Sequence, residues 1–394
     1  MEDILFQASE IVTPFEAIPD GLVWVNEDGQ IEWTGTENSL PEAARGLPRK
    51  EYPGERLLPG LIDIHLHGGF GIYFGEGDLR EGVHTYSKKI PFSGVTGFLL
   101  SIAAPTADEL VAIIKEYVNI FETNSFEGSQ PLGLHLEGPF LNPEKKGAFN
   151  PHWLRVPNIA EAKSYIEAGK GWIKQITIAP ELPNAFEVAR YLRQNGVKAA
   201  MGHTNATYEQ ASAALQQDFR HVTHTFNAQR GFNQREPGVF GAVMDSDEIH
   251  AELICDTIHV HPGAIKMAAR CLKPEQIVLI TDAIGGAHLP DGIYESLGQK
   301  ILIKNGLVLL ETGTIAGSTV ALNHALKNAA RYMEYNFHQV VRMATYNPAK
   351  VIGLENNRGS ITAGKRADLI AIDCDGSVTM NCIRGQIIYT KESA

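Results

Sequence analysis

The stretch RLLPGLIDIHLHGGFG, residues 56–71, ends an apolar run with two histidines one residue apart and places glycines directly after them. Alternate residues of a β-strand share a face, so Asp63, His65 and His67 are predicted to point the same way. The two glycines at 68 and 69 allow the chain to turn away without crowding the imidazole rings. The pattern therefore predicts a strand whose end presents a pair of imidazoles.

Similar strand-like runs recur through the middle of the chain and alternate with helix-like segments. They cover residues 58–67, 95–102, 131–137, 173–179, 197–203, 219–225, 250–256 and 276–282. Helical patterns lie between several of them, in TADELVAIIKEYVNIFE, NAFEVARYLRQNG, TYEQASAALQQ and PGAIKMAARCL. This alternation predicts an α/β fold, a (β/α)8 TIM barrel, with its active site at the carboxyl ends of the strands. An open doubly wound sheet is the alternative, but no G-x-G-x-x-G follows the first strand.

The two ends of the chain are rich in β-strand signals. GLVWVNEDGQIEWTG, residues 21–35, reads as a hairpin, and residues 359–390 give short strands separated by turns that contain glycine. A chain of 394 residues suits one large domain and one smaller domain. We therefore predict a small β-sandwich domain built from both termini, residues 1–56 and 357–394, around a barrel of residues 57–356.

Composition limits the partners and the compartment. The net charge of −12 argues against a nucleic-acid partner, because phosphate backbones require a basic surface. No apolar run approaches the roughly 20 residues of a membrane span. The four cysteines form no C-x-x-C pair, and the acidic start of the chain, interrupted by prolines, does not resemble a signal peptide. We expect a cytoplasmic protein with reduced thiols and no membrane partner.

Further histidines and carboxylates stand at other predicted strand ends. Glu137 ends the third strand, His203 the fifth, His224 the sixth and Asp282 the eighth. A lone histidine at such a place is more often structural, and His135 and His221 default to that role. The combination with the H-x-H pair is far more specific. Imidazoles and carboxylates together suit Zn²⁺, Fe²⁺, Mn²⁺ or Co²⁺, so the pattern predicts a metal site.

Several motifs carry a resemblance to a known family. PGLIDIHLHG and GSITAGKRADLIAID resemble motifs of the amidohydrolase superfamily, metal-dependent hydrolases on a (β/α)8 barrel. More narrowly, LHLEGPF, GHTNAT, THTFNAQRG and GTIAGS resemble the N-acetylglucosamine-6-phosphate deacetylase family, from about residue 54 to 373. The resemblance implies hydrolysis of N-acetyl-D-glucosamine 6-phosphate to D-glucosamine 6-phosphate and acetate. It also implies a homodimer.

The resemblance further implies a role for each matching residue. Glu137, His203 and His224 would hold one divalent ion, and His65 and His67 a second one that Glu137 bridges, so one or two ions are expected per subunit. Asp282 would be the general base. The implied substrate contacts, with the loop 313–318 closing over the sugar, are Asn227, Ala228, Arg235, His259, Ile315, Ala316 and Gly317.

Two positions depart from that family. Phe149 stands where relatives with a single metal carry a histidine that polarises the amide carbonyl, and a second ion at the H-x-H pair would compensate for its loss. Thr257 stands where glycine is expected, close to His259.

The alternatives left open are a deacetylase of N-acetylgalactosamine 6-phosphate, another N-acyl amidohydrolase such as a D-aminoacylase, and a non-catalytic scaffold. The presence of all the ligands and of Asp282 counts against the scaffold.

Overall fold

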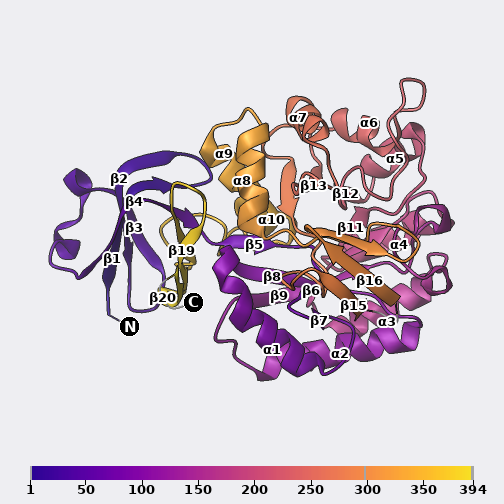
Figure 1. The fold of residues 1–394 in the computed structure, drawn as a ribbon, viewed down its shortest axis with the longest axis horizontal. Coiled ribbons are helices and arrows are strands. Elements are labelled where there is room, and N and C mark those ends of the chain that lie inside the picture. Colours follow the sequence, from indigo (N-terminus) through magenta and orange to yellow (C-terminus); the bar gives the residue numbers. More distant parts are fainter. Residues whose placement is uncertain (1, 297–298, 392–394) are drawn as a thin grey trace.

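The computed structural model describes residues 2–296 and 299–391, so Met1 and residues 392–394 of the predicted small domain lie outside it. Figure 1 shows a β-rich part that contains both chain ends beside a larger part in which helices surround strands. The fold is α/β, as the alternating pattern predicts.

The larger part is built on eight parallel strands that follow one another in sequence order. Their order in the chain is β5 (Leu61–Asp63), β8 (Val95–Ile102), β9 (Gln130–Glu137), β10 (Ile173–Ile178), β11 (Lys198–Met201), β12 (Phe219–Val222), β13 (His250–Ile254) and β14 (Ile277–Ile280). A parallel bridge between Leu66 and Ala283 joins the first strand to the last, and the Asp282 N–H donates to the His65 carbonyl at 2.8 Å. The predicted (β/α)8 barrel is confirmed.

The first predicted strand, residues 58–67, is wrong at both ends, because β5 ends at Asp63 and His65 and His67 lie beyond it. It is divided at Gly60, and the residues before Gly60 belong to β4 (Arg49–Pro59) of the other sheet. A Cβ at Gly60 would lie 2.2 Å from the Thr96 side chain, so the chain can cross between the two parts only where no side chain is present. The apolar run thus contributes residues to both the smaller sheet and the barrel.

Helices cover the barrel. They are α1 (Leu79–Lys89), α2 (Ala107–Thr123), α3 (Ile159–Gly169), α4 (Ala185–Gln194), α5 (Tyr208–Leu215), α6 (Gly238–Met244), α7 (Pro262–Cys271), α8 (Leu322–Tyr332), α9 (Phe337–Met343) and α10 (Tyr346–Val351). Several begin at capping side chains that satisfy free N–H groups; Thr106 and Glu109 form a capping box at the start of α2. Within residues 2–296 and 299–391, no helix is long and apolar enough to cross a membrane.

The smaller part is a seven-stranded sheet drawn from both ends of the chain. Its order is β20 (Gln386–Thr390), β19 (Val378–Ile383), β18 (Leu369–Ile372), β4, β1 (Ile4–Val12), β2 (Ala17–Val25) and β3 (Ile31–Thr36). β4 pairs with β1 on one side and with β18 on the other, which joins the two termini. We propose 1–56 with 357–394 and 57–356 as the domain limits; β4 extends the smaller sheet to Pro59.

Two small sheets lie outside these predictions. One is the pair β6 (Gly68–Gly69) and β7 (Ile72–Tyr73), directly after the H-x-H pair. The other is antiparallel and consists of β15 (Gly292–Ser296), β16 (Gln299–Lys304) and β17 (Leu307–Leu310). It follows the last barrel strand and has its own buried cluster around Ile301 and Val308.

Candidate active site

Glu137, the last residue of β9, lies at the centre of a group of imidazole rings at the carboxyl end of the barrel. Its Oε1 lies 3.0 Å from His224 Nε2, 3.2 Å from His203 Nε2 and 3.3 Å from His65 Nε2. Its Oε2 lies 2.8 Å from His67 Nε2. The five residues predicted from the strand ends are thus brought together, and all five are buried.

Asp282 completes the group. It follows β14, and its Oδ1 lies 3.5 Å from His65 Nε2 and 3.6 Å from His67 Nε2. His203, His224 and Asp282 all have left-handed backbone, with φ of 46°, 30° and 50°. Such conformations are costly for residues other than glycine, and they cluster where a structure holds functional side chains in place.

Three of the four imidazoles are oriented by a partner at Nδ1. His65 Nδ1 lies 2.8 Å from Glu252 Oε2, and His203 Nδ1 lies 2.8 Å from the Lys145 carbonyl. His67 Nδ1 lies 3.3 Å from the Tyr73 hydroxyl, whose ring stacks on the imidazole. An acceptor at Nδ1 places the proton there and leaves the Nε2 lone pair of His65 and His203 directed at Glu137.

This donor set fits a divalent metal ion. His65 Nε2 is buried and has no hydrogen-bond partner in the described part of the chain. His203 Nε2 and His224 Nε2 lie only 3.0 Å apart and both face Glu137 Oε1, so the three atoms could hold one ion between them. The ligand atoms form two sets that share Glu137, one with His65, His67 and Asp282 and one with His203 and His224. Imidazole and carboxylate ligands of this kind suit Zn²⁺ and similar ions.

Burial and charge act against each other at this site. Burial raises the pKa of Glu137, but the charge of His65 and hydrogen bonds from His203 and His224 outweigh it and hold that pKa well below its ordinary value. Burial lowers the pKa of His65, but the nearby carboxylates outweigh it and hold that pKa well above its ordinary value. A metal ion at Nε2 would displace the proton that this nitrogen otherwise carries. Glu137 is therefore an anion, as a metal ligand must be.

A cavity of about 380 Å³ opens above the cluster, within the size range of small-molecule sites. Most of the predicted site residues line it: His67, Glu137, His203, His224, Asn227, Ala228, His259, Asp282, Ile315, Ala316 and Gly317. His65 lies fully buried, outside this lining. Arg235 does not line the cavity; it lies exposed in the loop that follows Asn227 and Ala228.

The two unusual positions are both near the cavity. The Phe149 ring lines it and meets the His203 ring edge to face, with 5.2 Å between centroids. Thr257 has φ of 69°, the left-handed conformation for which glycine is the usual residue. The turn at Thr257 brings His259 Nδ1 to 2.6 Å from Asp256 Oδ2, so Asp256 orients the His259 ring.

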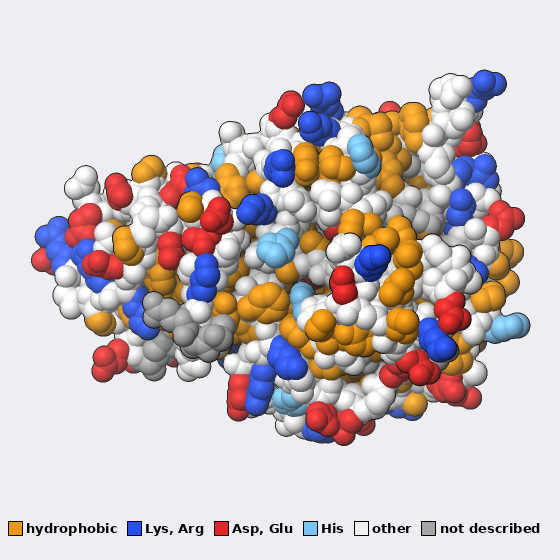
Figure 2. All heavy atoms as spheres, viewed as in Figure 1, with side chains coloured by type: hydrophobic (Ala, Val, Ile, Leu, Met, Phe, Trp, Pro, Cys, Tyr) orange, Lys and Arg blue, Asp and Glu red, His pale blue; other side chains and the backbone are white. Residues whose placement is uncertain are grey.

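The loop 313–318 closes one side of the cavity beside Asp282. The Ser318 N–H donates to the Asp282 carbonyl at 2.9 Å, and Gly317, with φ of 63°, approaches the same carbonyl closely. β16 and β17 complete this wall with Gln299, Ile301 and Leu310. Figure 2 shows hydrophobic side chains gathered over this small sheet, where Ile293 and Leu302 are exposed.

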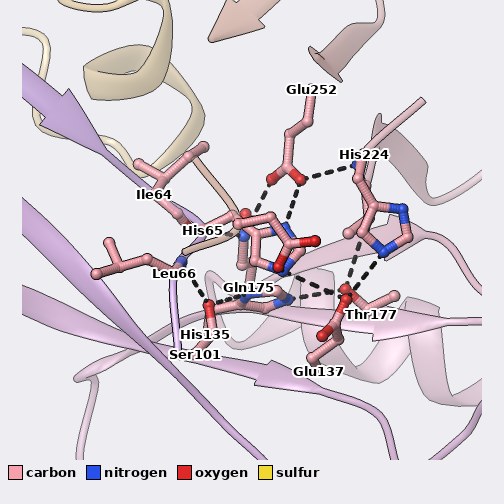
Figure 3. A network of polar contacts seen from close by, with 12 residues as sticks. Ile64, His65, Leu66, Ser101, His135, Glu137, Gln175, Thr177, His224 and Glu252 are labelled. Atoms are coloured by element: carbon pink, nitrogen blue, oxygen red, sulfur yellow. Dashed lines mark hydrogen bonds and ion pairs between the residues drawn. The ribbon is translucent and has the colours of Figure 1, made fainter. Parts of the chain in front are cut away.

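The prediction missed a polar network beneath the cavity, drawn in Figure 3. Its centre is Glu252 on β13, fully buried, which contacts His65, His221 and the backbone N–H of His224. His135 belongs to the same layer, between the Ser101 and Thr177 hydroxyls at 2.8 Å each. The available signal was a glutamate within the apolar run HAELIC, since a charged residue there must find partners in the barrel interior.

Comparisons with known proteins show which family the chain resembles over its length. The amidohydrolase family model matches residues 56–388. N-acetylglucosamine-6-phosphate deacetylase of Bacillus subtilis is 34% identical over 399 residues, which cover 100% of this chain and 99% of the relative. N-acetylgalactosamine-6-phosphate deacetylase of Escherichia coli O157:H7 is 33% identical over 341 residues, with 86% of this chain and 89% of the relative covered.

A solved structure is also similar over the whole chain. It is a mutant N-acetyl-D-glucosamine-6-phosphate deacetylase from Mycobacterium smegmatis in complex with N-acetyl-D-glucosamine 6-phosphate. The TM-score is 0.90 at 29% sequence identity, and the match covers 99% of this chain and 100% of that one.

Proposed function

This chain belongs to the amidohydrolase family, and we propose that it hydrolyses the N-acetyl amide of N-acetyl-D-glucosamine 6-phosphate to give D-glucosamine 6-phosphate and acetate. One observation carries the proposal: four imidazoles converge on Glu137 beside Asp282, at the floor of a cavity of substrate size. The matched relatives that act on this sugar phosphate cover the whole chain, which supports the substrate class.

The residues for the metal follow from the two ligand sets. We propose Glu137, His203 and His224 for one ion, and His65 with His67 for a second, with Glu137 shared. Zinc, iron, manganese and cobalt all suit this set, and availability often decides between such ions. When bound, the metal supplies a Lewis acid for the amide carbonyl and lowers the pKa of a water molecule toward about 7.

Asp282 is the proposed proton carrier. It lines the cavity, is only slightly exposed, and stands next to both histidines of the H-x-H pair. Its carboxylate accepts a proton from the attacking water and then gives a proton to the departing amine, so that the amine leaves as a neutral group. The same residue thus acts as base and then as acid.

The sugar phosphate needs contacts at the other end of the cavity. We propose Asn227, the backbone at Ala228 and His259 as contacts, with the Asp256 carboxylate orienting the His259 ring. Arg235 would read the phosphate from the exposed loop, because its planar fork matches phosphate oxygens. Ile315, Ala316 and Gly317 would close over the sugar ring from the opposite wall.

N-acetylgalactosamine 6-phosphate is the second candidate substrate. The favouring observation is the 33% identity with a deacetylase of that sugar, nearly equal to the 34% identity with the glucosamine enzyme. The two sugars differ in the configuration of one hydroxyl group, so measuring kcat/KM for each sugar with the same enzyme preparation separates the candidates.

We further propose a homodimer in the cytoplasm, which size-exclusion chromatography and cell fractionation would test.

The deciding experiment measures acetate release from N-acetyl-D-glucosamine 6-phosphate together with metal content of the same purified sample. We expect turnover with a divalent metal bound, loss of turnover after chelation and its return when metal is restored. Unphosphorylated N-acetylglucosamine and an N-acetylated D-amino acid serve as comparison substrates. Bound metal with no turnover on either sugar phosphate would contradict the proposal, and preference for the amino acid would indicate an aminoacylase.

A further inference from the structure

Glu252 lies outside the cavity, yet it contacts one residue of each ligand set, His65 and His224. Its carboxylate is fully buried within β13. Oε2 lies 2.8 Å from His65 Nδ1 and accepts from the His224 N–H at 3.0 Å, while Oε1 lies 2.7 Å from His221 Nε2. Figure 3 shows this carboxylate on the opposite side of the His65 ring from Glu137. A buried carboxylate with this set of partners is held in one orientation.

The contact with His65 decides which nitrogen of that ring is free. A carboxylate accepts only, so the proton of a neutral His65 must lie on Nδ1 and the lone pair on Nε2. Nε2 is the buried atom that faces Glu137 and Asp282 and has no hydrogen-bond partner among the described residues. Without Glu252 the ring could carry its proton on Nε2 and bind Glu137 directly.

The partners of the other ligands differ in kind. His203 Nδ1 meets a neutral carbonyl, that of Lys145, and His67 Nδ1 meets the Tyr73 hydroxyl, which can donate as well as accept. Within the described chain, Glu252 is therefore the one carboxylate that contacts a ligand ring at Nδ1. It also places a second buried negative charge beside the position where His65 and His67 would add a second cation to the site.

We propose that Glu252 is a positioning residue that makes the His65–His67 position able to bind an ion, so that the chain takes up two metal ions instead of one. His221 takes part by occupying Oε1, which leaves Oε2 for His65. The inference rests on the metal site of the proposed function, but its test does not require turnover. It predicts that the two ions respond differently when Glu252 is changed.

The test compares metal binding of the holoenzyme and of two variants. Glu252→Met keeps similar volume without an acceptor, whereas Glu252→Gln keeps an acceptor for the His65 N–H but removes the charge. Stoichiometry is measured by elemental analysis after dialysis, and affinity by competition titration with a chelator. Asp218→Asn is the matched control, because Asp218 is a nearly buried carboxylate just before β12 that pairs with Arg193 away from the cluster.

We expect about two ions in the wild type and in Asp218→Asn, and about one in Glu252→Met, held by Glu137, His203 and His224. Glu252→Gln should bind the second ion about 10–100-fold more weakly than the wild type, but still better than the methionine variant. Partial recovery of second-ion binding in Glu252→Gln would show that the acceptor for the His65 N–H matters. A merely structural role would not predict this recovery. If Glu252→Met fails to fold, the titration of Glu252→Gln decides alone.

Three outcomes would overturn the inference: a wild type that binds one ion, unchanged affinity for the second ion in the Glu252 variants, or equal weakening of both ions. Each is read from metal binding alone. A failure of the proposed deacetylation would appear separately, as absence of acetate release by a wild type that binds two ions. The two proposals can therefore fail independently.

Discussion

At the scale of single residues, Asp282 shows how backbone and side chain are set together. Its φ of 50° directs the carboxylate toward the H-x-H pair, and its carbonyl accepts from Ser318 of the covering loop. The backbone strain at this position is maintained by hydrogen bonds on both sides, since the Asp282 N–H donates to His65. These hydrogen bonds hold the Asp282 carboxylate at a fixed position beside His65 and His67.

Asp282→Asn should retain the metal and lose most of the turnover. The amide has the same shape but cannot take a proton from water, and general acid–base groups contribute about 10²–10⁴-fold to a rate. The measurement is kcat for acetate release, with metal content determined on the same sample. Turnover close to that of the wild type would remove Asp282 as the proton carrier, while loss of metal would instead make it a required ligand.

Arg235→Ala should raise KM for the phosphorylated sugar more than for the unphosphorylated one. A charge-assisted contact to phosphate contributes about 1.5–3 kcal/mol, so a change of roughly 10–100-fold is expected. Arg270→Ala is the control for loss of charge, because Arg270 is exposed on α7 and pairs with Glu334. Equal effects of Arg235→Ala on both sugars would show that this side chain does not read the phosphate.

At the scale of elements, the small sheet β15–β17 forms a wall of the cavity with its own core. Ile301 is buried and packs with Ile284, Val308 and Ala316 in a cluster separate from the main cluster of the barrel. The next residue, Leu302, points to the other face and is 42% exposed. The period of two along β16 therefore separates a cavity-facing position from a solvent-facing one.

Ile301→Ala should loosen this sheet while the barrel stays folded. Replacing a buried isoleucine by alanine lowers stability by about 2–5 kcal/mol, and here the destabilisation is confined to the small sheet. We expect faster hydrogen exchange in residues 299–310 and a raised KM, with the main thermal transition little changed. Leu302→Ala is the matched control and should leave both unchanged. Equal effects of the two substitutions would contradict a cavity wall with a separate core.

At the scale of the whole molecule, the far end of the barrel carries His250, a half-buried histidine at the start of β13. Burial, together with the charges of His221, Lys350 and Lys198, lowers the pKa of His250 to about 3. In the unfolded chain this pKa returns to about 6.5. Between these two values the unfolded state binds a proton that the folded state does not, so the contribution of His250 to stability is complete above pH 6.5 and declines as the pH falls toward 3.

His250→Gln should therefore flatten the pH dependence of the free energy of unfolding between pH 6.5 and 3. The measurement is urea unfolding of the wild type and the variant at several pH values in this window. The difference between the two proteins isolates His250 from the carboxylates that also titrate there. A difference that stays constant across the window would show that His250 is not held neutral in the folded state.

The site was largely predictable from local pattern, and the reason lies in particular residues. In a (β/α)8 barrel the carboxyl ends of all strands share one rim, so Glu137, His203 and His224 at strand ends had to converge once the strands were recognised. Glu252 was missed because it lies inside a strand, where the sequence alone does not reveal its partners. Nor did a pattern along the chain indicate that Arg235 would lie outside the cavity lining.

The sequence by itself determined the alternation of strands and helices, the contribution of both chain ends to a second sheet, and the residues that could bind a metal. These follow from local periodicity and from side-chain chemistry. The tertiary structure alone decided the division of the first apolar run at Gly60, the wall formed by β15–β17 and the contact of Glu252 with His65. Those features depend on which atoms from distant segments meet, since packing and hydrogen-bond geometry are properties of the folded chain.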